Sequence, residues 1–304
     1  SRPFNYYKKS DSLMTSKLRP RRSMLYVPGC DRRYLEKAKS LRVDSVILDL
    51  GDPILFEAKE QSRENVVEFL SNKDYGNREV VVRVNDLDSP WGKDDIKAIA
   101  SLKPDAVLFP NIESKDDVIE AISALDNAGG DNVPVMVMIE SPLAVLHAEE
   151  IASASDRIAC MVLATSDLIS QMAARVTHER TALLTSLSLV ILAARAHGRG
   201  VIDGIHSKLN DTNAFEYACR LGRDMGFDGK SLVHPDQLPY ANDAYTPKHS
   251  EIAHAEKVIK GLREANEAGR GTVVVNERLI ERHNVKAAEK LLMMRDSITE
   301  LENE

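Results

Sequence analysis

The stretch VPVMVMIESPLAVLHAEEIASASDRIACMVLATSDL (residues 133–168) contains two strongly apolar runs, each followed by an acidic residue. The first run, 133–139, stops at Glu140, and the second, 157–163, stops shortly before Asp167. Unbroken apolar runs of this length are typical of strands buried on both faces of a parallel sheet. The residues between the runs have the length of a helix that connects two parallel strands. The stretch therefore predicts a strand–helix–strand unit with a carboxylate just beyond each strand.

Similar apolar runs alternate with segments of helical periodicity on both sides of this unit. They lie within residues 21–29, 44–50, 79–85, 105–110, 200–204 and 229–235. Eight strands that alternate with helices indicate parallel βαβ units, and eight such units close into a barrel more naturally than they form an open sheet. We therefore predict an α/β fold, a (β/α)₈ TIM barrel with a C-terminal helical extension, over the rival doubly wound sheet.

The chain divides into three parts by its pattern. Residues 1–20 form a polar tail that lacks the apolar core of a secretory signal, and we expect its first 17 residues to be mobile. Residues 21–245 carry the barrel. Residues 246–304 lie outside the repeat and contain two long helical segments, so we expect them to cover the barrel mouth, to pack on a neighbouring subunit, or both.

Composition excludes several classes of protein. The 304 residues are 43% hydrophobic and 29% charged, as in ordinary globular proteins. A net charge of -7 gives no general basic footprint for nucleic acid. No apolar run approaches the roughly 20 residues of a membrane helix. The three cysteines lack metal spacing, which favours reduced thiols in a cytoplasmic protein.

Polar residues gather where the predicted strands end, which in a barrel is the mouth that carries the chemistry. They are Asp49, Asp52, Arg83, Asn85, Glu140, Asp167, Asp203 and His234. Glu140 and Asp167 together suit Mg²⁺, which keeps several waters and takes oxygen ligands from substrate. Acidic residues after strands also serve as helix caps or first-turn residues, and Ser141-Pro142 is a plausible helix start, so both readings stay open.

Arg83 lies inside an apolar strand, where an arginine is costly unless it meets an anion. It can form an ion pair with Asp49 or Asp52, or direct its guanidinium at a substrate carboxylate or a developing enolate oxygen. The two roles are compatible with each other. His234 is read as a loop histidine with satisfied hydrogen bonds, and Asp203 as the cap of a turn.

Seven motifs in order resemble the citrate lyase β-subunit-like (HpcH/HpaI aldolase) family, whose members include malyl-CoA and citramalyl-CoA lyases. They are RSMLYVPG (22–29), LDLGD (48–52), VRVN (82–85), MIESP (138–142), SDL (166–168), IDG (202–204) and GFDGKSLVHPDQ (226–237). The resemblance implies a TIM barrel with a C-terminal extension, assembled as trimers or larger oligomers, with a homotrimer favoured. It also implies that the metal is Mg²⁺.

The resemblance assigns roles to individual residues. Glu140 and Asp167 match the magnesium ligands, and Arg83 matches an arginine at the reacting centre. Glu281 matches a carboxylate that reaches a neighbour's active site. Asp49 and Asp52 are further catalytic candidates. The phosphates of a CoA thioester are expected to meet basic residues near the mouth, for which the candidates are Arg21, Arg22 and Lys230.

One departure from the family pattern concerns catalysis. The family usually reads LDLED, whereas this chain has Gly51 in place of the glutamate that would order metal-bound waters. Asp52 or water takes over that role, the substrate differs, or catalysis has been lost.

The resemblance implies cleavage of a short 3-hydroxyacyl-CoA, with citramalyl-CoA favoured, to acetyl-CoA and a 2-oxo acid, here pyruvate. Arg83 would stabilise oxyanion charge, and Glu281 would protonate the enolate carbon. A malyl-CoA lyase is one alternative, since one methyl group is worth only about 1–3 kcal/mol of discrimination. A malyl-CoA thioesterase and a CoA-derivative-binding protein with reduced or lost catalysis are the others.

Overall fold

The computed structural model describes residues 18–269 and 272–303 of the chain. The described residues form two compact units, one spanning Arg21–Tyr245 and the other containing the residues from Thr246 onward together with those up to Pro20. The expectation of a mobile segment at 1–17 lies outside the described residues. Each unit is considered by itself below.

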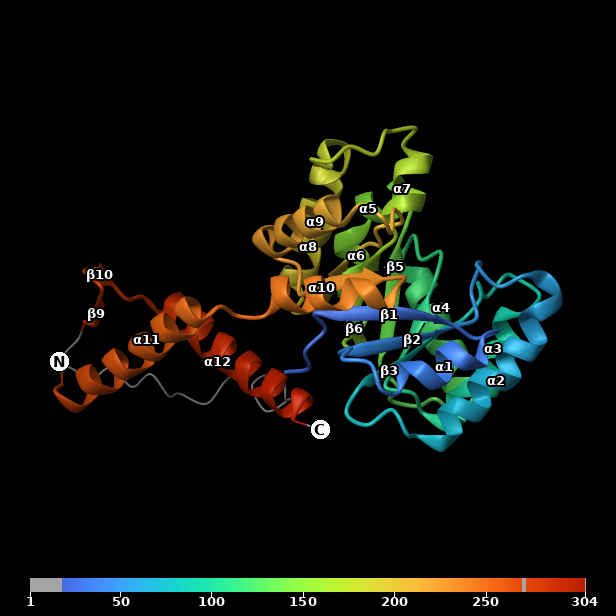
Figure 1. Ribbon diagram of the computed structural model, residues 1–304, viewed down its shortest axis with the longest axis horizontal. Helices are drawn as coiled ribbons and strands as arrows, with labels where there is room; N and C mark the ends of the chain where they lie inside the picture. The colour runs from blue at the N-terminus through green and yellow to red at the C-terminus, as the bar shows by residue number, and fades with distance from the viewer. Residues whose placement is uncertain (1–17, 270–271, 304) are drawn as a thin grey trace. The chain divides into compact units, whose positions relative to one another are not determined.

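The first unit is built on a closed barrel of eight parallel strands, each hydrogen-bonded to the next in sequence order, with β8 returning to β1 (Figure 1). The strands are Ser23–Pro28 (β1), Ser45–Asp49 (β2), Glu79–Arg83 (β3), Ala106–Phe109 (β4), Val135–Ile139 (β5), Ile158–Leu163 (β6), Gly200–Asp203 (β7) and Gly229–Leu232 (β8). The predicted TIM barrel is confirmed, and the open sheet is excluded.

Alternation along the strands gives two apolar layers, because successive side chains of a strand point to opposite faces. One cluster, which includes Met24, Ile47 and Val162, fills the barrel interior, with Tyr26 packed against it. A larger cluster joins the outer strand faces to the surrounding helices. Both faces of the strands are buried, which is why their sequences read as continuous apolar runs rather than alternating ones.

Helices follow the strands around the barrel. They are Arg32–Ala38 (α1), Lys59–Asn72 (α2), Gly92–Ile99 (α3), Lys115–Asn127 (α4), Pro142–Leu146 (α5), Ala148–Ser153 (α6), Thr165–Gln171 (α7), Leu184–Ala196 (α8), Thr212–Met225 (α9) and Leu238–Tyr245 (α10). Short 3₁₀ turns occur at Phe56–Ala58, Ala100–Leu102, Thr181–Leu183 and Pro235–Gln237. None of the described helices is long and apolar enough to cross a membrane.

Two features of the β5–β6–β7 region differ from the expectation. The single connecting helix is two short helices, α5 and α6, interrupted at His147, whose ring Nδ1 lies 2.9 Å from the carbonyl oxygen of Glu113. After β6, the seven residues of α7 form a helix that the sequence did not predict. Seven residues span only about two turns, too few for a helical period to show in the sequence.

The second unit is a helical hairpin with a small β-ribbon. Helix α11 spans His249–Glu267 and helix α12 spans Arg282–Glu302, and strands β9 (Val274–Val275) and β10 (Arg278–Leu279) pair between them. The two helices share an apolar cluster built on Ala255, Val258, Val285 and Ala288. The predicted C-terminal helical extension is therefore present.

Candidate active site

Arg83, the last residue of β3, forms a two-point ion pair with Asp49, the last residue of β2. The register places the two residues side by side. Arg83 Nε lies 2.6 Å from Asp49 Oδ1, and Nη2 lies 2.7 Å from Oδ2. Both side chains are largely buried, at 13% and 3% exposed. The ion-pair reading of Arg83 is confirmed, with Asp49 rather than Asp52 as its partner.

The remaining edge of the Arg83 guanidinium is turned away from Asp49. Its Nη1 lies 3.8 Å from the sulfur of Met138, and its Cζ lies 4.7 Å from the centre of the Tyr26 ring. A cation over an aromatic face gains further stabilisation from the ring quadrupole. The guanidinium is thus fixed by its neighbours while Nη1 makes no bond to a carboxylate in the described part of the chain.

Gly51 makes room for this ion pair. Its backbone N–H donates to Asp49 Oδ1 at 2.8 Å. A Cβ built at position 51 would lie 2.8 Å from Arg83 Nε and 3.1 Å from Asp49 Oδ1. Any side chain at position 51 would therefore compete for space with the guanidinium of Arg83.

Lys59 supports the same loop, and sequence reasoning missed it. Its Nζ donates to the carbonyl oxygens of Leu50 (3.1 Å) and Gly51 (2.8 Å) and to Asn85 Oδ1 (2.7 Å). The side chain is buried, and burial lowers its pKa. Its position on the buried face of an amphipathic helix was the signal that could have identified it.

Glu140 and Asp167 lie beyond the ends of β5 and β6, as the sequence predicted. Glu140 is half-buried and accepts a hydrogen bond from the backbone N–H of Asn111, and Asp167 is exposed in the first turn of α7. Burial raises the pKa of Glu140, and the negative charges of Asp167 and Asp52 raise it further, against the opposing effects of the Asn111 N–H and Arg83. Asp52, Arg83 and Asp167 are therefore all close enough to Glu140 for their charges to affect its pKa.

Tyr26 belongs to the same group, although it was quoted only as part of a motif. Burial raises its pKa to about 12, with Arg83 opposing the rise and Asp49, Glu140 and Asp167 adding to it. The phenol is therefore neutral near pH 7. Its place in the middle of a strand, on the interior face, is what brings it to this site.

The carboxylates at the site set the kind of metal that fits. Among residues 18–269 and 272–303, no group of three or more His, Cys, Asp or Glu side chains is arranged to hold a metal ion. Glu140 and Asp167 alone offer two oxygen ligands, and the charge of Asp167 adds to the rise in the pKa of Glu140. Two carboxylates with other positions left to water or substrate oxygens suit Mg²⁺ better than Zn²⁺, which prefers closed nitrogen and sulfur sites.

Arg21 and Arg22 do not lie near the barrel mouth, so that prediction is wrong. They precede β1 and are therefore at the N-terminal end of the barrel strands. Arg21 forms a two-point pair with Glu79, at 2.7 and 2.6 Å. Arg22, only 4% exposed, pairs with Asp44 at 2.9 and 2.8 Å. These pairs join the starts of β1, β2 and β3, so their role is structural.

Lys230 is engaged in an ion pair within the protein, and its contact with a CoA phosphate stays a prediction. It is 1% exposed, and its Nζ lies 2.8 Å from Asp203 Oδ2 and 2.6 Å from the carbonyl oxygen of Gly204. Asp203 also accepts two bonds from Arg180, at 2.7 and 2.6 Å. The turn-cap reading of Asp203 is confirmed, since Gly204 N donates to its Oδ1 at 2.8 Å, but the buried Arg180–Asp203–Lys230 triad was not foreseen.

Three other residues singled out in the sequence have local roles or lie elsewhere. His234 Nδ1 accepts from the backbone N–H of Asp236 at 3.2 Å, as expected of a satisfied loop histidine. Ser141 caps α5 through the N–H of Ala144 at 3.1 Å, which confirms the helix start. Glu281 is exposed at the start of α12, in the second unit, and its role in a neighbouring active site stays a prediction.

The sequence matches the family model described as HpcH/HpaI aldolase/citrate lyase over residues 22–235. It is 39% identical over 285 residues to a protein named (3S)-malyl-CoA thioesterase from Cereibacter sphaeroides, covering 94% of this chain and 98% of the relative. It is 34% identical over 282 residues to the citrate lyase subunit beta of Leuconostoc mesenteroides subsp. cremoris, covering 91% and 93%.

Solved structures give the same result. Protein CitE from Mycobacterium tuberculosis, in complex with magnesium, acetoacetate and coenzyme A, matches with a TM-score of 0.72 and 25% identity, covering 91% of this chain and 98% of that one. The resemblance seen in the motifs is confirmed, and with it the expectation of an enzyme. The chain belongs to the HpcH/HpaI aldolase/citrate lyase family.

Proposed function

We propose that the protein is a Mg²⁺-dependent carbon–carbon lyase that cleaves a short 3-hydroxyacyl-CoA, citramalyl-CoA being favoured, to acetyl-CoA and pyruvate. The observation that carries the proposal is the placement of Arg83 at the end of β3 and of Glu140 and Asp167 just beyond β5 and β6, at one end of the barrel, with the guanidinium held at two points by Asp49. Such a cleavage needs an alkoxide to form at one carbon and an oxyanion to be stabilised at the thioester. A cation-binding pair of carboxylates beside a fixed guanidinium meets both needs.

Glu140 and Asp167 would hold the magnesium ion, which when bound supplies a Lewis acid that lowers the pKa of a substrate hydroxyl. Named relatives support this assignment. The Mycobacterium tuberculosis CitE structures were solved with magnesium, in one case with coenzyme A and acetoacetate and in another with pyruvate. The raised pKa of Glu140 adds support, because a bound cation would offset both the burial that chiefly raises it and the smaller repulsion from Asp167.

The chain's own residues supply the rest of the chemistry. Arg83 Nη1 is the donor available for the thioester oxygen that gains negative charge, while Nε and Nη2 stay on Asp49. Lys59 and Gly51 keep the strand-end loop in the position that this pair requires. Glu281 would protonate the enolate carbon from a neighbouring subunit of a homotrimer. We also propose a cytoplasmic location, which the three unpaired thiols of Cys30, Cys160 and Cys219 support.

A malyl-CoA thioesterase is the second candidate, and the 39% identity to a protein of that name favours it. The same carboxylates and guanidinium would then act on a water that attacks the thioester carbonyl. A malyl-CoA lyase differs from the leading proposal only in the acyl methyl group. A binding protein without turnover is suggested only by Gly51, and the intact Arg83–Asp49 ion pair disfavours it.

Product analysis separates these functions. The full chain is incubated with Mg²⁺ and either citramalyl-CoA or malyl-CoA, and acetyl-CoA, free CoA, pyruvate and glyoxylate are quantified. Equimolar acetyl-CoA and pyruvate from citramalyl-CoA support the proposal, whereas free CoA without a 2-oxo acid identifies a thioesterase. Turnover is expected to disappear with EDTA and in Glu140→Gln and Asp167→Asn, but not in the matched surface variant Glu120→Gln. Absence of products from both substrates, in protein that still binds CoA, would identify a binding protein.

A further inference from the structure

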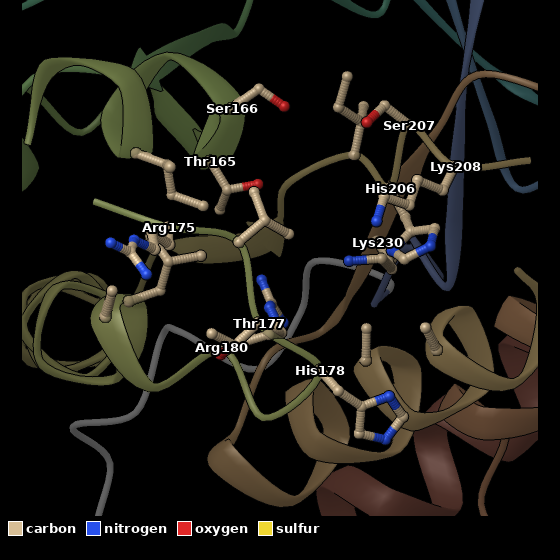
Figure 2. Close-up of a pocket in the computed structure, with 17 residues that line it drawn as sticks. Thr165, Ser166, Arg175, Thr177, His178, Arg180, His206, Ser207, Lys208 and Lys230 are labelled. Atoms are coloured by element: carbon tan, nitrogen blue, oxygen red, sulfur yellow. The ribbon is translucent and has the colours of Figure 1, made fainter. Parts of the chain in front are cut away.

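A cavity of about 120 Å³ lies outside the barrel interior, between the loops that follow β6 and β7 (Figure 2). Thr165 and Ser166, the residues that precede Asp167, line one side, and Ser207 and Ala214 line another. The two loops come from neighbouring strands, and of the residues given a role in the proposed reaction only Asp167 lies beside this lining. A cavity of this size accommodates a small molecule rather than a nucleotide.

The lining of the cavity is strongly basic. Six of its residues carry basic side chains, and none of the lining residues is an aspartate or a glutamate; the basic residues are Arg175, His178, Arg180, His206, Lys208 and Lys230. Figure 2 shows these side chains arriving from several different segments of the chain. Within residues 18–269 and 272–303, neither Arg175 nor Lys208 forms an ion pair, although both are exposed. A cavity lined by this many basic side chains favours the binding of an anion.

The wall of the cavity also holds an excess of buried positive charge. Arg180 and Lys230 both bind Asp203, and the three side chains are 9%, 1% and 0% exposed. Two cations therefore share one carboxylate where little water reaches them. Buried charges are costly unless they are paired, so one cation in the triad lacks a full counter-charge. An anion in the cavity would supply it.

His206 provides an independent sign of a missing ligand. Its Nε2 is buried and has no hydrogen-bond partner among the described residues, while its ring lies 5.7 Å from that of Phe215. Burial lowers the pKa of His206, and the charge of Lys230 lowers it further. Buried polar atoms nearly always have a partner in folded proteins, so an unpartnered ring nitrogen at a cavity points to an absent acceptor.

We infer that this cavity is a binding site for a small organic oxyanion, distinct from the metal-binding carboxylates. Its charged group would lie between Lys208, His206 and the Arg180–Lys230 pair, and its carbon skeleton would lie against the apolar lining residues Val176 and Leu183. The oxyanion is either the carboxylate of a free short-chain acid or the phosphate group of a CoA ester. The inference does not depend on the lyase reaction, because neither occupant needs Mg²⁺ or cleavage of an acyl-CoA in order to bind.

Calorimetric titration of the full chain without divalent cation tests the inference. The probes are malonate, inorganic phosphate and CoA, each at constant ionic strength maintained with sodium chloride. Lys208→Ala removes an exposed cation of the cavity, and His206→Phe removes the unpartnered nitrogen while keeping the ring against Phe215. Lys93→Ala removes an exposed lysine elsewhere on the barrel unit and serves as the matched control.

The expected result is saturable binding of malonate or phosphate at one site per chain, with Kd raised at least fivefold in Lys208→Ala and in His206→Phe and unchanged in Lys93→Ala. If the two variants weaken CoA binding instead, the occupant is the phosphate group of the thioester. No saturable binding of any probe, or equal affinity in all four proteins, overturns the inference. Because Lys208 is exposed, its replacement is expected to leave the protein folded, so weaker binding in Lys208→Ala reports on the cavity and not on unfolding.

Discussion

Gly51 backs directly onto the guanidinium of Arg83: a Cβ at position 51 would lie 2.8 Å from Arg83 Nε and 3.0 Å from Cζ. The absence of a side chain there is part of what allows Arg83 to pair at two points with Asp49. The departure from the family's LDLED pattern is therefore linked to the position of the arginine, and not only to the waters around a metal.

Replacing Gly51 with alanine is expected to displace Arg83 and to lower kcat by roughly tenfold to a hundredfold, because small misplacements of a catalytic group have effects of that order. The fold is expected to persist, since the clash is with a side chain. Measuring kcat by steady-state kinetics, together with the thermal midpoint, for the natural chain and for Gly51→Ala checks this prediction. A large gain of activity in Gly51→Glu would contradict it and would indicate that the natural chain has lost turnover.

Arg83→Lys is expected to lower kcat about 10²–10³-fold, the usual cost of removing one donor to a developing oxyanion. Lysine keeps the charge beside Asp49 but cannot bond the carboxylate at two points and also present Nη1. The effect should fall on kcat more than on KM, because the interaction forms chiefly in the transition state. A change confined to KM would assign Arg83 to ground-state binding.

Mg²⁺ is expected to raise the thermal midpoint of the protein, and EDTA to reverse the rise. A ligand at 100 times its Kd adds about 2.7 kcal/mol to the free energy of unfolding. The raised pKa of Glu140 means that its ionised form is disfavoured in the folded protein, so Glu140→Gln should be no less stable than the natural chain without metal. The same variant should lose the response to Mg²⁺. An undiminished response in Glu140→Gln would place the ion elsewhere.

The barrel and much of its mouth were predictable because the strands are buried on both faces. Strands buried on both faces have continuous apolar sequences. Each such run ends at a polar residue, and the strand direction tells at which end of the barrel that residue lies. Asp49, Arg83, Glu140 and Asp167 were found in this way. Strand direction also explains the error with Arg21 and Arg22, since residues that precede a parallel strand lie at the opposite end of the barrel from those that follow it.

The Arg180–Asp203–Lys230 triad could not be predicted, for a physical reason. Arg180 immediately precedes the 3₁₀ turn Thr181–Leu183 and has a left-handed backbone conformation, φ 56°, which the sequence does not indicate. Its pairing with a residue at the end of β7 depends on how two loops fold over the barrel wall. Lys59 is an intermediate case, because its helix was predicted but its reach to the carbonyl oxygens of Leu50 and Gly51 was not.

Asp203→Asn is expected to destabilise the barrel by about 3–5 kcal/mol at neutral pH, because it leaves Arg180 and Lys230 facing each other without an anion. Burial alone would raise the pKa of Asp203, but Lys230 and Arg180 outweigh it and lower the pKa below its usual range. The stabilisation is therefore complete above the unfolded pKa of about 3.9 and is lost as the pH falls through the lower, folded pKa.

Urea unfolding followed by the fluorescence of Trp91, the single tryptophan of the chain, checks both parts of this prediction, because Trp91 belongs to the barrel unit. The difference in the free energy of unfolding between the natural chain and Asp203→Asn should be the same at pH 7 and pH 5.5. It should become smaller only below about pH 4. Asp94→Asn, which changes an exposed aspartate, is the control. If this difference in unfolding free energy already disappears between pH 7 and pH 5.5, a histidine, and not Asp203, governs the stability of this region.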